Sequence, residues 1–226
     1  MAAPPLSVSV LGEAQRRKLD ESDDALFYTQ PRFVHHLDGA FRSRLTRLYR
    51  EHLKPQWRVL DLMSSWVSHL PEDVTYTEVI GHGLNADELA ANPRLHRHWR
   101  QNLNQDQRLP LEAGSVDAAL IVAGWQYLQQ PEAVAAELRR VLTPGGLLIV
   151  AFSNRMFHTK APQAWLEASD RERLSLVAKV LLCQDWQLER LIAEDTRAEG
   201  PLGWIGGNGD PFFAVLARTP AGGGHG

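Results

Sequence analysis

The sequence contains very little cysteine and no long apolar segment. Cys183 is the single cysteine among 226 residues, so no internal disulfide can form. This usage fits a reducing compartment, and Cys183, which follows three apolar residues, is expected to be buried as a small apolar side chain. No apolar run is long enough to span a membrane, and the N-terminus lacks the basic and apolar regions of a signal peptide. We therefore expect a cytoplasmic protein with no membrane partner.

Several kinds of site are missing as well. No cluster of cysteine and histidine has the spacing of a zinc site, so we expect no metal. No glycine-rich loop of the phosphate-binding or nicotinamide-binding type opens a helix. The net charge of −3 supplies no electrostatic attraction for nucleic acid or for an anionic membrane. The 44% hydrophobic content is typical of a globular domain and leaves the oligomeric state open.

The most informative segment of the chain covers residues 131–152 and combines a helix, a turn and a strand. Pro131 suits the first position of a helix, where an N–H group is not needed. Pro144 cannot continue that helix, and Gly145 permits a positive φ in the turn that follows. The apolar run that begins at Leu147 is too short to cross a membrane. It predicts a strand that is covered on both faces.

Strands and helices alternate along most of the chain. We expect helices over residues 26–54, 84–91, 131–142 and 170–182, and strands over residues 58–63, 76–82, 100–103, 115–123, 147–152, 186–192 and 212–217. This alternation predicts an α/β fold: a three-layer Rossmann-like sandwich around a mostly parallel seven-stranded sheet with an antiparallel edge strand. In such a sheet, ligands bind beyond the carboxyl ends of the strands.

We expect three parts in the chain. An N-terminal helical segment, residues 1–54, covers the cleft, residues 55–218 form the Rossmann-like domain, and residues 219–226 form a disordered tail. Within the domain, the stretch 200–211 is rich in glycine and proline and is expected to be a loop.

Three segments resemble motifs of the class I S-adenosylmethionine-dependent methyltransferases. Residues 59–62, Val-Leu-Asp-Leu, are similar to the family's first strand, and residues 109–117 resemble its approach to strand four. Residues 140–146, Arg-Val-Leu-Thr-Pro-Gly-Gly, resemble its turn before strand five. The resemblance covers residues 57–155 and is closest to the small-molecule type-11 methyltransferase-like domains. It implies S-adenosylmethionine as cofactor, a small molecule as methyl acceptor, and residues 55–218 as a methyltransferase-like domain.

The chain departs from this family at the glycine-rich loop. The family's first strand leads into three spaced glycines, whereas this chain has Met63, Ser64, Ser65, Trp66 and Val67. Glycines at this place let the backbone turn sharply and approach the methionine half of the cofactor. The serine hydroxyls can hydrogen-bond a carboxylate, but the indole or the thioether could also fill the cofactor position.

A second departure concerns the polar residues after the second and third strands. The family's acidic ribose ligand is replaced by Gly83, and Asn85 and Asp87 are either polar substitutes or caps of the following helix. After the third strand, amides stand where the family has an acid. Asp61 is retained, and the resemblance implies a role in holding the cofactor's ammonium group. The cofactor-binding residues that the resemblance implies are Asp61, Met63, Ser64, Ser65, Gly83, Leu84, Asn85, Asn102, Leu103, Asn104, Ala123, Gly124 and Trp125.

The acceptor side carries no distinct catalytic signature. Methyl transfer depends mainly on alignment, and a base is needed only where the acceptor must lose a proton. Imidazole titrates near neutral pH, so His158 and His35 are candidate bases, with His36 and the phenol of Tyr28 nearby. Each of these also has an ordinary role in packing or at the surface. The candidates for substrate binding are Tyr28, Arg32, Phe33, Tyr127, Asn154 and Arg155.

Two functions remain open on this basis. The first is an S-adenosylmethionine-dependent methyltransferase that acts on a small molecule through an atypical first loop. The second is a catalytically inactive protein of the same fold that serves as a binding or scaffold module, which the missing glycines and the missing ribose acid would favour.

Overall fold

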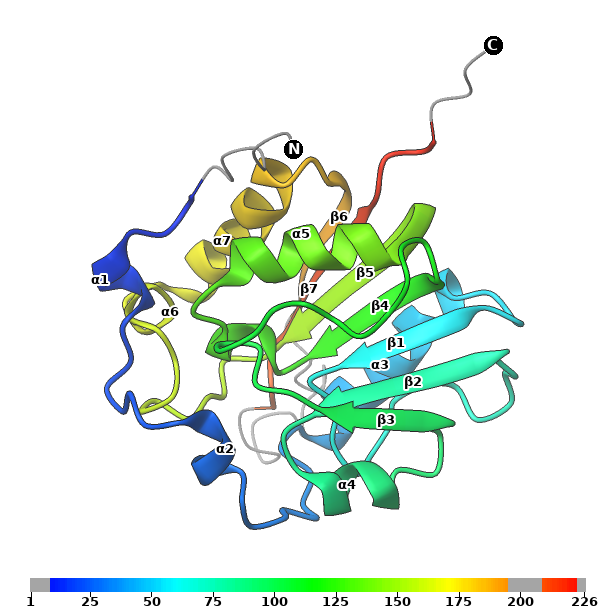
Figure 1. Ribbon diagram of the computed structural model, residues 1–226, viewed down its shortest axis with the longest axis horizontal. Helices are drawn as coiled ribbons and strands as arrows, with labels where there is room; N and C mark the ends of the chain where they lie inside the picture. Colours follow the sequence, from blue (N-terminus) through cyan, green and yellow to red (C-terminus); the bar gives the residue numbers. More distant parts are fainter. Residues whose placement is uncertain (1–8, 195–208, 223–226) are drawn as a thin grey trace, which may run out of the picture.

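A seven-stranded sheet organises the protein, seen in a computed structural model that describes residues 9–194 and 209–222. The strands lie in the order β3-β2-β1-β4-β5-β7-β6 (Figure 1). Every neighbouring pair from β3 to β5 is parallel, and β7 runs antiparallel to both β5 and β6. The expected mostly parallel sheet with an antiparallel pair at one edge is confirmed. The strands are β1 (Arg58–Leu62), β2 (Glu78–Gly83), β3 (Arg97–Arg100), β4 (Val116–Val122), β5 (Leu142–Phe152), β6 (Gln187–Glu194) and β7 (Phe212–Arg218).

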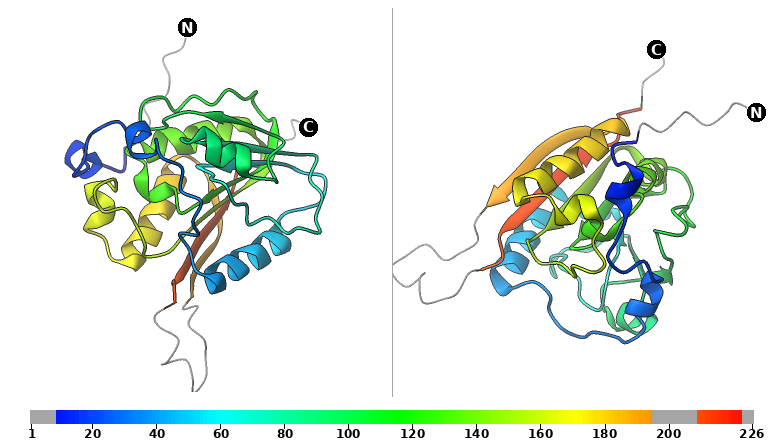
Figure 2. Two further views of the ribbon diagram at one scale, coloured as in Figure 1. Left: turned by 90° about the horizontal axis from the view of Figure 1, so that it is seen from below. Right: turned by 90° about the vertical axis from the view of Figure 1, so that its left-hand side faces the viewer.

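Helices cover both faces of this sheet. Helices α5 and α7 pack on one face and α3 packs on the other, which Figure 2 shows from two further sides. The shorter helices lie at the ends of the strands, and α4 contacts β2 and β3. The helices are α1 (Glu13–Arg16), α2 (Asp24–Phe27), α3 (Gly39–His52), α4 (Ala86–Ala91), the 3-10 helix η1 (Trp125–Tyr127), α5 (Pro131–Val141), α6 (Gln163–Leu166) and α7 (Asp170–Cys183).

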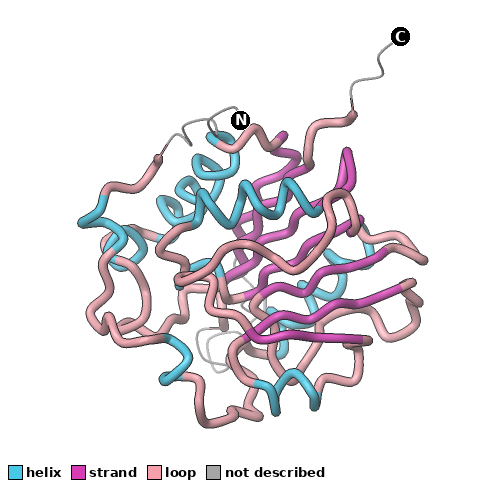
Figure 3. The backbone as a smooth tube through the Cα atoms, in the orientation of Figure 1, coloured by secondary structure: helices cyan, strands magenta, loops and turns pink. Residues whose placement is uncertain are grey.

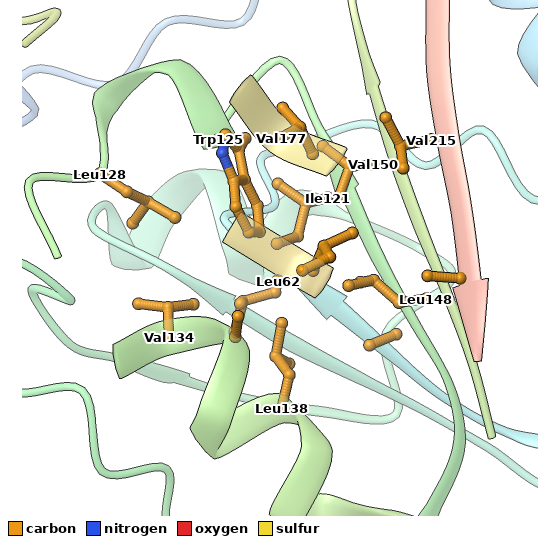
Figure 4. Packing of buried hydrophobic residues seen from close by; sticks show 14 of the residues in the cluster. Leu62, Ile121, Trp125, Leu128, Val134, Leu138, Leu148, Val150, Val177 and Val215 are labelled. Atoms are coloured by element: carbon orange, nitrogen blue, oxygen red, sulfur yellow. The ribbon is translucent and has the colours of Figure 1, made fainter. Parts of the chain in front are cut away.

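Alternation along the central strands divides the core into two layers. In β5, Leu148 and Val150 face the α5 and α7 layer, whereas Leu147 and Ile149 face the α3 layer. All four side chains are fully buried, as the sequence predicts for a strand covered on both faces. In the first layer, several of the residues labelled in Figure 4 meet between the sheet and α5, among them Leu62, Ile121, Trp125, Leu128, Val134 and Leu138.

The single helix expected over residues 26–54 is wrong. The chain instead forms α2 and α3, joined by a loop over residues 28–38 that the tube of Figure 3 shows between them. Asp38 begins α3, because its carboxylate accepts a hydrogen bond from the N–H of Phe41 at 2.8 Å. Pro31 lies within the loop, where its preceding residue disfavours helical backbone.

Several element boundaries differ from those expected. The third strand ends at Arg100, where the sequence suggests residues 100–103, because β3 pairs with β2 through Arg97–Arg100. The strand expected from Leu147 begins at Leu142, and the turn at Gly145 (φ +74°) forms an irregularity within β5. The expected loop 200–211 lies mostly outside the described residues, as does the end of the expected tail, residues 223–226.

The interpretation of Cys183 as a buried residue is wrong. Cys183 is the last residue of α7 and is exposed, because it falls on the helix face turned away from α5 and the sheet. The cap of the same helix is the residue immediately before it. Ser169 is the N-cap, and its hydroxyl and N–H both contact the Glu172 carboxylate, at 2.6 and 2.8 Å.

Two leucine substitutions test the assigned core. Leu138 is fully buried under the sheet, whereas Leu182 on α7 is 54% exposed. We expect Leu138→Ala to lower the free energy of unfolding by about 2–5 kcal/mol, because it leaves a cavity. Leu182→Ala should change it by less than about 0.5 kcal/mol. Urea unfolding followed by circular dichroism measures both, and equal losses would contradict the assignment of α5 to the core.

Candidate functional site

A cavity of about 380 Å³ lies at the carboxyl ends of β1, β2 and β4. These strands meet where the chain order of the sheet reverses, since β2 and β3 extend to one side of β1, and β4 and β5 extend to the other. This is the place where open α/β sheets bind ligands, and the volume is within the range of small-molecule sites. The other wall comes from residues 24–37, which we call the lid segment and which run from α2 past α4 to α3 (blue in Figure 1).

The loop after β1 turns sharply although it contains no glycine. Met63 has a φ of 58°, and Ala123, which follows β4 on the neighbouring strand, has a φ of 49°. Left-handed backbone is costly for residues that carry a Cβ and persists where the surroundings enforce it. The missing glycines of the first loop are therefore replaced by strained non-glycine backbone at the edge of the cavity.

His82 at the end of β2 holds this turn in place. The N–H of Met63 donates to Nδ1 of His82 at 3.1 Å, and the N–H of Ser64 donates to the His82 carbonyl at 2.6 Å. Because Nδ1 accepts, Nε2 carries the proton and donates to the Gln101 carbonyl at 2.9 Å. Burial lowers the pKa of His82 to about 4, so the imidazole is neutral at pH 7. One uncharged ring thereby joins the ends of β1, β2 and β3.

Two glycines on neighbouring strands allow the same turn to pack closely. A Cβ on Gly124 would lie 2.8 Å from the Met63 Cβ, and a Cβ on Gly83 would lie 2.6 Å from the Ser64 carbonyl oxygen. Real Cβ atoms essentially never approach this closely, so both positions require glycine. The close approach that the family obtains within its first loop is obtained here from β2 and β4.

Asp61 lies at the base of the cavity and is 7% exposed. Burial raises the pKa of its carboxyl to about 6, although the Ser64 hydroxyl, which donates to it at 2.8 Å, lowers the pKa. The carboxylate therefore carries its charge at pH 7 in a setting that disfavours the charge. A cationic group entering the cavity would stabilise it.

Glu88, in the first turn of α4, is a cavity residue that the sequence analysis missed. One of its oxygens accepts from the Ser65 hydroxyl at 2.6 Å, and the other accepts from the N–H of Arg32 at 2.7 Å. Glu88 thus ties the loop after β1 to the lid segment. The sequence did hold a signal, since Asn85 and Glu88 have the spacing of a cap residue and its acidic partner.

Asn85 is the cap of α4, which settles the alternative left open by the sequence. Its side-chain oxygen accepts from the N–H groups of Asp87 and Glu88, both at 3.0 Å. Its amide nitrogen donates to the Tyr28 carbonyl at 2.8 Å, so it also fixes the lid segment. The polar atoms of Asn85 are therefore already engaged within the protein.

The amides after β3 also hold the start of the lid segment, at Asp24 and at Asp23 just before it. The Asn102 amide donates to Asp23 at 2.8 Å, and the Asn104 amide donates to Asp24 at 2.8 Å. Both residues line the cavity together with Leu103, which is 3% exposed.

Two lysines bind the lid segment to the rest of the protein through buried ion pairs. The Lys18 ammonium lies 2.7 Å from Asp24, and that of Lys160 lies 3.0 Å from Asp20 and 3.6 Å from Asp24. Both lysine side chains are only 1% exposed. Breaking such a pair would leave an uncompensated buried charge, so the N-terminal residues are held firmly over the cavity.

Aromatic rings form the wall of the cavity beyond β4 and β5. The rings of Tyr127 and Phe157 stack with centroids 6.1 Å apart, and Tyr28 lies across from them on the lid segment. The Arg32 guanidinium lies 5.3 Å from the Tyr28 ring centroid and 5.5 Å from that of Phe157. Burial raises the pKa of Tyr28 well above its usual value and that of Tyr127 to about 12. Both phenols therefore stay protonated at neutral pH and are poor candidates for a base.

The structure brings most of the predicted site residues together. Of the cofactor candidates, all but Trp125 line the cavity, and Trp125 is 3% exposed within the core under η1. Of the acceptor-side candidates, Tyr28, Arg32, His35, Tyr127 and Arg155 line it. Those that lie elsewhere are Phe33, Asn154 and His158, which are all exposed.

The indole of Trp66 does not fill the cavity. Its N–H donates to the Val34 carbonyl at 3.2 Å, and its ring lies against His35 with centroids 5.0 Å apart. Trp66 is thereby turned toward the outer side of the lid segment and is absent from the cavity lining. Met63 does line the cavity, with its Cβ and sulfur against Gly124.

The strand order and the cavity at the switch point define a Rossmann-like α/β protein with a cavity beyond the carboxyl ends of its central strands. Residues 62–150 match a protein-family model described as a methyltransferase domain. The match runs from the end of β1 into β5 and supports a class I S-adenosylmethionine-dependent methyltransferase, a class whose cofactor is S-adenosylmethionine.

Solved structures with the same fold include proteins of several activities. A methyltransferase from Aquifex aeolicus is 14% identical with a TM-score of 0.55, covering 87% of this chain and 97% of its own. Geranyl diphosphate C-methyltransferase from Streptomyces coelicolor A3(2) is 13% identical with a TM-score of 0.58, covering 86% and 96%. The cyclase SpnF is 16% identical with a TM-score of 0.58, covering 79% and 82%. These likenesses show the fold alone, and no curated protein matches the sequence significantly.

The part of the chain that the structure describes shows neither a metal site nor a membrane span. Within residues 9–194 and 209–222, no three side chains of histidine, cysteine, aspartate or glutamate are grouped so that they could hold a metal ion. Over the same residues, no helix is long and apolar enough to cross a membrane.

The raised pKa of Asp61 predicts a pH-dependent cost to stability. Between pH 4 and 6 the folded chain holds a proton on Asp61 that the unfolded chain has released, so the stability contributed by the neutral carboxyl is lost as pH rises through 6. The free energy of unfolding of the ligand-free protein, relative to Asp61→Asn, should fall by about 2 kcal/mol from pH 4 to pH 7. Urea unfolding at each pH measures this difference.

A surface aspartate is the control for this experiment. Arg50 lowers the pKa of Asp73. The free energy of unfolding of the protein, relative to that of Asp73→Asn, should therefore rise with pH instead of falling. Burial also lowers the pKa of His82, and its contribution to the free energy of unfolding rises with pH. Because His82 is present in both proteins, the comparison with Asp61→Asn cancels that contribution. A difference that stays flat between pH 4 and 7 would contradict the assigned burial of the Asp61 charge.

Proposed function

We propose that this protein is an S-adenosylmethionine-dependent methyltransferase that acts on a small molecule bound under the lid segment. The proposal depends on one observation: the crevice above β1 and β4 is open, because Trp66 turns outward and the Met63 side chain packs against Gly124. In this proposal, residues 1–54 cover the site and residues 55–218 form the catalytic domain. The aromatic wall and the volume of the cavity, about 380 Å³, favour a small organic acceptor over a macromolecule.

The cavity offers groups that match the parts of the cofactor. Asp61 lies where a cationic ammonium group would offset its buried charge, and Ser64 beside it supplies a hydroxyl for a carboxylate. Gly83 and Leu84 lie on the side where the ribose would bind, and Leu103 presents an apolar side chain for the adenine. We assign these five residues to the cofactor.

The remaining residues would orient the acceptor. When bound, S-adenosylmethionine supplies an electrophilic methyl group, and the protein's contribution is to align the acceptor atom with it and to exclude water. His36 lines the cavity beside His35, and its ring lies 5.7 Å from that of Phe157. Partial burial lowers the pKa of His36, so it is neutral at pH 7 and able to accept a proton. We assign it the role of base for acceptors that must lose one.

The second candidate function is a binding module that has lost catalysis. Gly83 occupies the position of the ribose acid and cannot accept a hydrogen bond through a side chain, and Asn85 nearby is committed to α4 and the lid segment. This observation favours weak or absent cofactor binding. The two functions therefore differ in a quantity that can be measured directly.

Calorimetry with S-adenosylhomocysteine separates the two functions. We expect the full chain to bind it, and we expect Ser64→Ala to weaken the affinity about tenfold, because the hydroxyl beside Asp61 is lost. Ser68→Ala is the matched control, since Ser68 lies in the same loop and outside the cavity lining. Its affinity should stay within about twofold of the parent.

The contrary results are equally specific. Folded protein that gives no binding heat with S-adenosylhomocysteine or S-adenosylmethionine would favour the binding module over the enzyme. Binding that Ser64→Ala and Ser68→Ala weaken equally would mean that the cofactor lies elsewhere than beside Asp61.

A further inference from the structure

Among the cavity-lining residues that the structure describes, three buried polar atoms have no hydrogen-bond partner. One is Oδ1 of Asp24, which has the Lys160 ammonium 3.6 Å away, and the other two are Nη1 of Arg32 and Oε1 of Gln126. Both side chains line the cavity, Arg32 from the lid segment and Gln126 from η1 after β4, and Gln126 is 2% exposed. A buried donor or acceptor without a partner is costly, so the protein alone leaves both groups unsatisfied. One atom needs an acceptor and the other needs a donor.

The positive charge of Arg32 is also unusual within this cavity. Its Nη2 donates to the Phe27 carbonyl at 2.9 Å, and its guanidinium lies 4.4 Å from the Phe27 ring centroid. The rings stabilise the charge, but no carboxylate of the described residues is within ion-pair distance of it. Of the other cations that line the cavity, Arg155 pairs with Asp210 and Lys160 pairs with Asp20 and Asp24, whereas Arg42 has no ion pair among the described residues.

The chemistry of these groups specifies a ligand. An arginine with a free N–H, held among aromatic rings, matches a carboxylate with apolar or aromatic surface beside it. The surrounding rings of Tyr28, Tyr127 and Phe157 offer faces and edges to a planar molecule. The free oxygen of Gln126 selects a hydroxyl or an amino group.

We infer that the methyl acceptor is a small aromatic carboxylic acid that also carries a hydroxyl or amino group. Its carboxylate binds Nη1 of Arg32, and its hydroxyl or amino group donates to Oε1 of Gln126. That this acid is methylated rests on the proposed function, whereas its binding in the cavity does not. Both protein atoms are already shielded from water, so binding restores hydrogen bonds without desolvating them. The acid reaches them when side chains of the lid segment shift to admit it.

Binding of simple probes tests this inference without any catalytic turnover. The full chain is titrated by calorimetry with 2-, 3- and 4-hydroxybenzoate, with benzoate, and with the matching neutral hydroxybenzamides, each with and without S-adenosylhomocysteine. We expect at least one hydroxybenzoate to bind about tenfold or more tightly than its amide, and more tightly than benzoate. Equal affinities for acid and amide in the unaltered protein would overturn the inference.

Variants at the two atoms locate the binding. Arg32→Gln should abolish the preference for acid over amide, and Arg32→Lys should keep part of it by retaining the charge. Gln126→Met, which has a similar length and no strong acceptor, should abolish the preference for hydroxybenzoate over benzoate. Arg47→Gln on the exposed face of α3 changes the net charge equally, and it should keep both preferences.

The failures of this inference and of the proposed function are distinguishable. If S-adenosylhomocysteine does not bind but a hydroxybenzoate does, the proposed methyltransferase fails and the acid site stands. If Arg32→Gln weakens S-adenosylhomocysteine and leaves the acid preference intact, Arg32 serves the cofactor and the acid site is overturned. If Arg32→Gln and Arg47→Gln lose the preference equally, the effect is one of net charge and the inference is also overturned.

Discussion

The hydrogen bonds of a single neutral imidazole set the shape of the site. His82 accepts from the N–H of Met63 and donates to the Gln101 carbonyl, and so joins three strand ends around a turn that contains no glycine. The ring can do this only while uncharged, and its burial keeps it so. The direction of the loop after Met63, the outward position of Trp66 and the opening above Asp61 all follow from this turn. Glycine is required instead at Gly83 and Gly124, because the turn packs closely against both residues.

The lid segment is the second structural requirement, and polar contacts hold it together with the buried Leu37 and ring contacts. Buried ion pairs of Lys18 and Lys160 with Asp24 fix one end, and the amides of Asn85 and Asn104 fix its course past α4 and β3. Several residues at the strand ends therefore bind the protein's own N-terminal part. In the proposed function, this division of roles leaves Asp61 and Ser64 for a cofactor, and the aromatic wall for an acceptor.

Much of the architecture could be predicted from the sequence because local patterns carry it. The helix that begins at Pro131 and the buried strand that follows were predictable, since a proline, a turn and an apolar run act on their immediate neighbours. The break between α2 and α3 was not, because the aromatic and apolar residues of 26–38 fit a helix face equally well. What decides that segment is its contact with Asn85 and Glu88, which are more than fifty residues away in the chain.

The candidate site divides in the same way. The sequence by itself determined the order of the strands' motifs, the place of Asp61 and the absence of the first-loop glycines, because these are properties of adjacent residues. Only the tertiary structure decided that the crevice is open, that Gly83 and Gly124 supply the close approach, and that Arg32 and Gln126 face one cavity. The reason is physical: close packing and hydrogen bonding are set by distances between strands and loops, and spacing along the chain does not fix those distances.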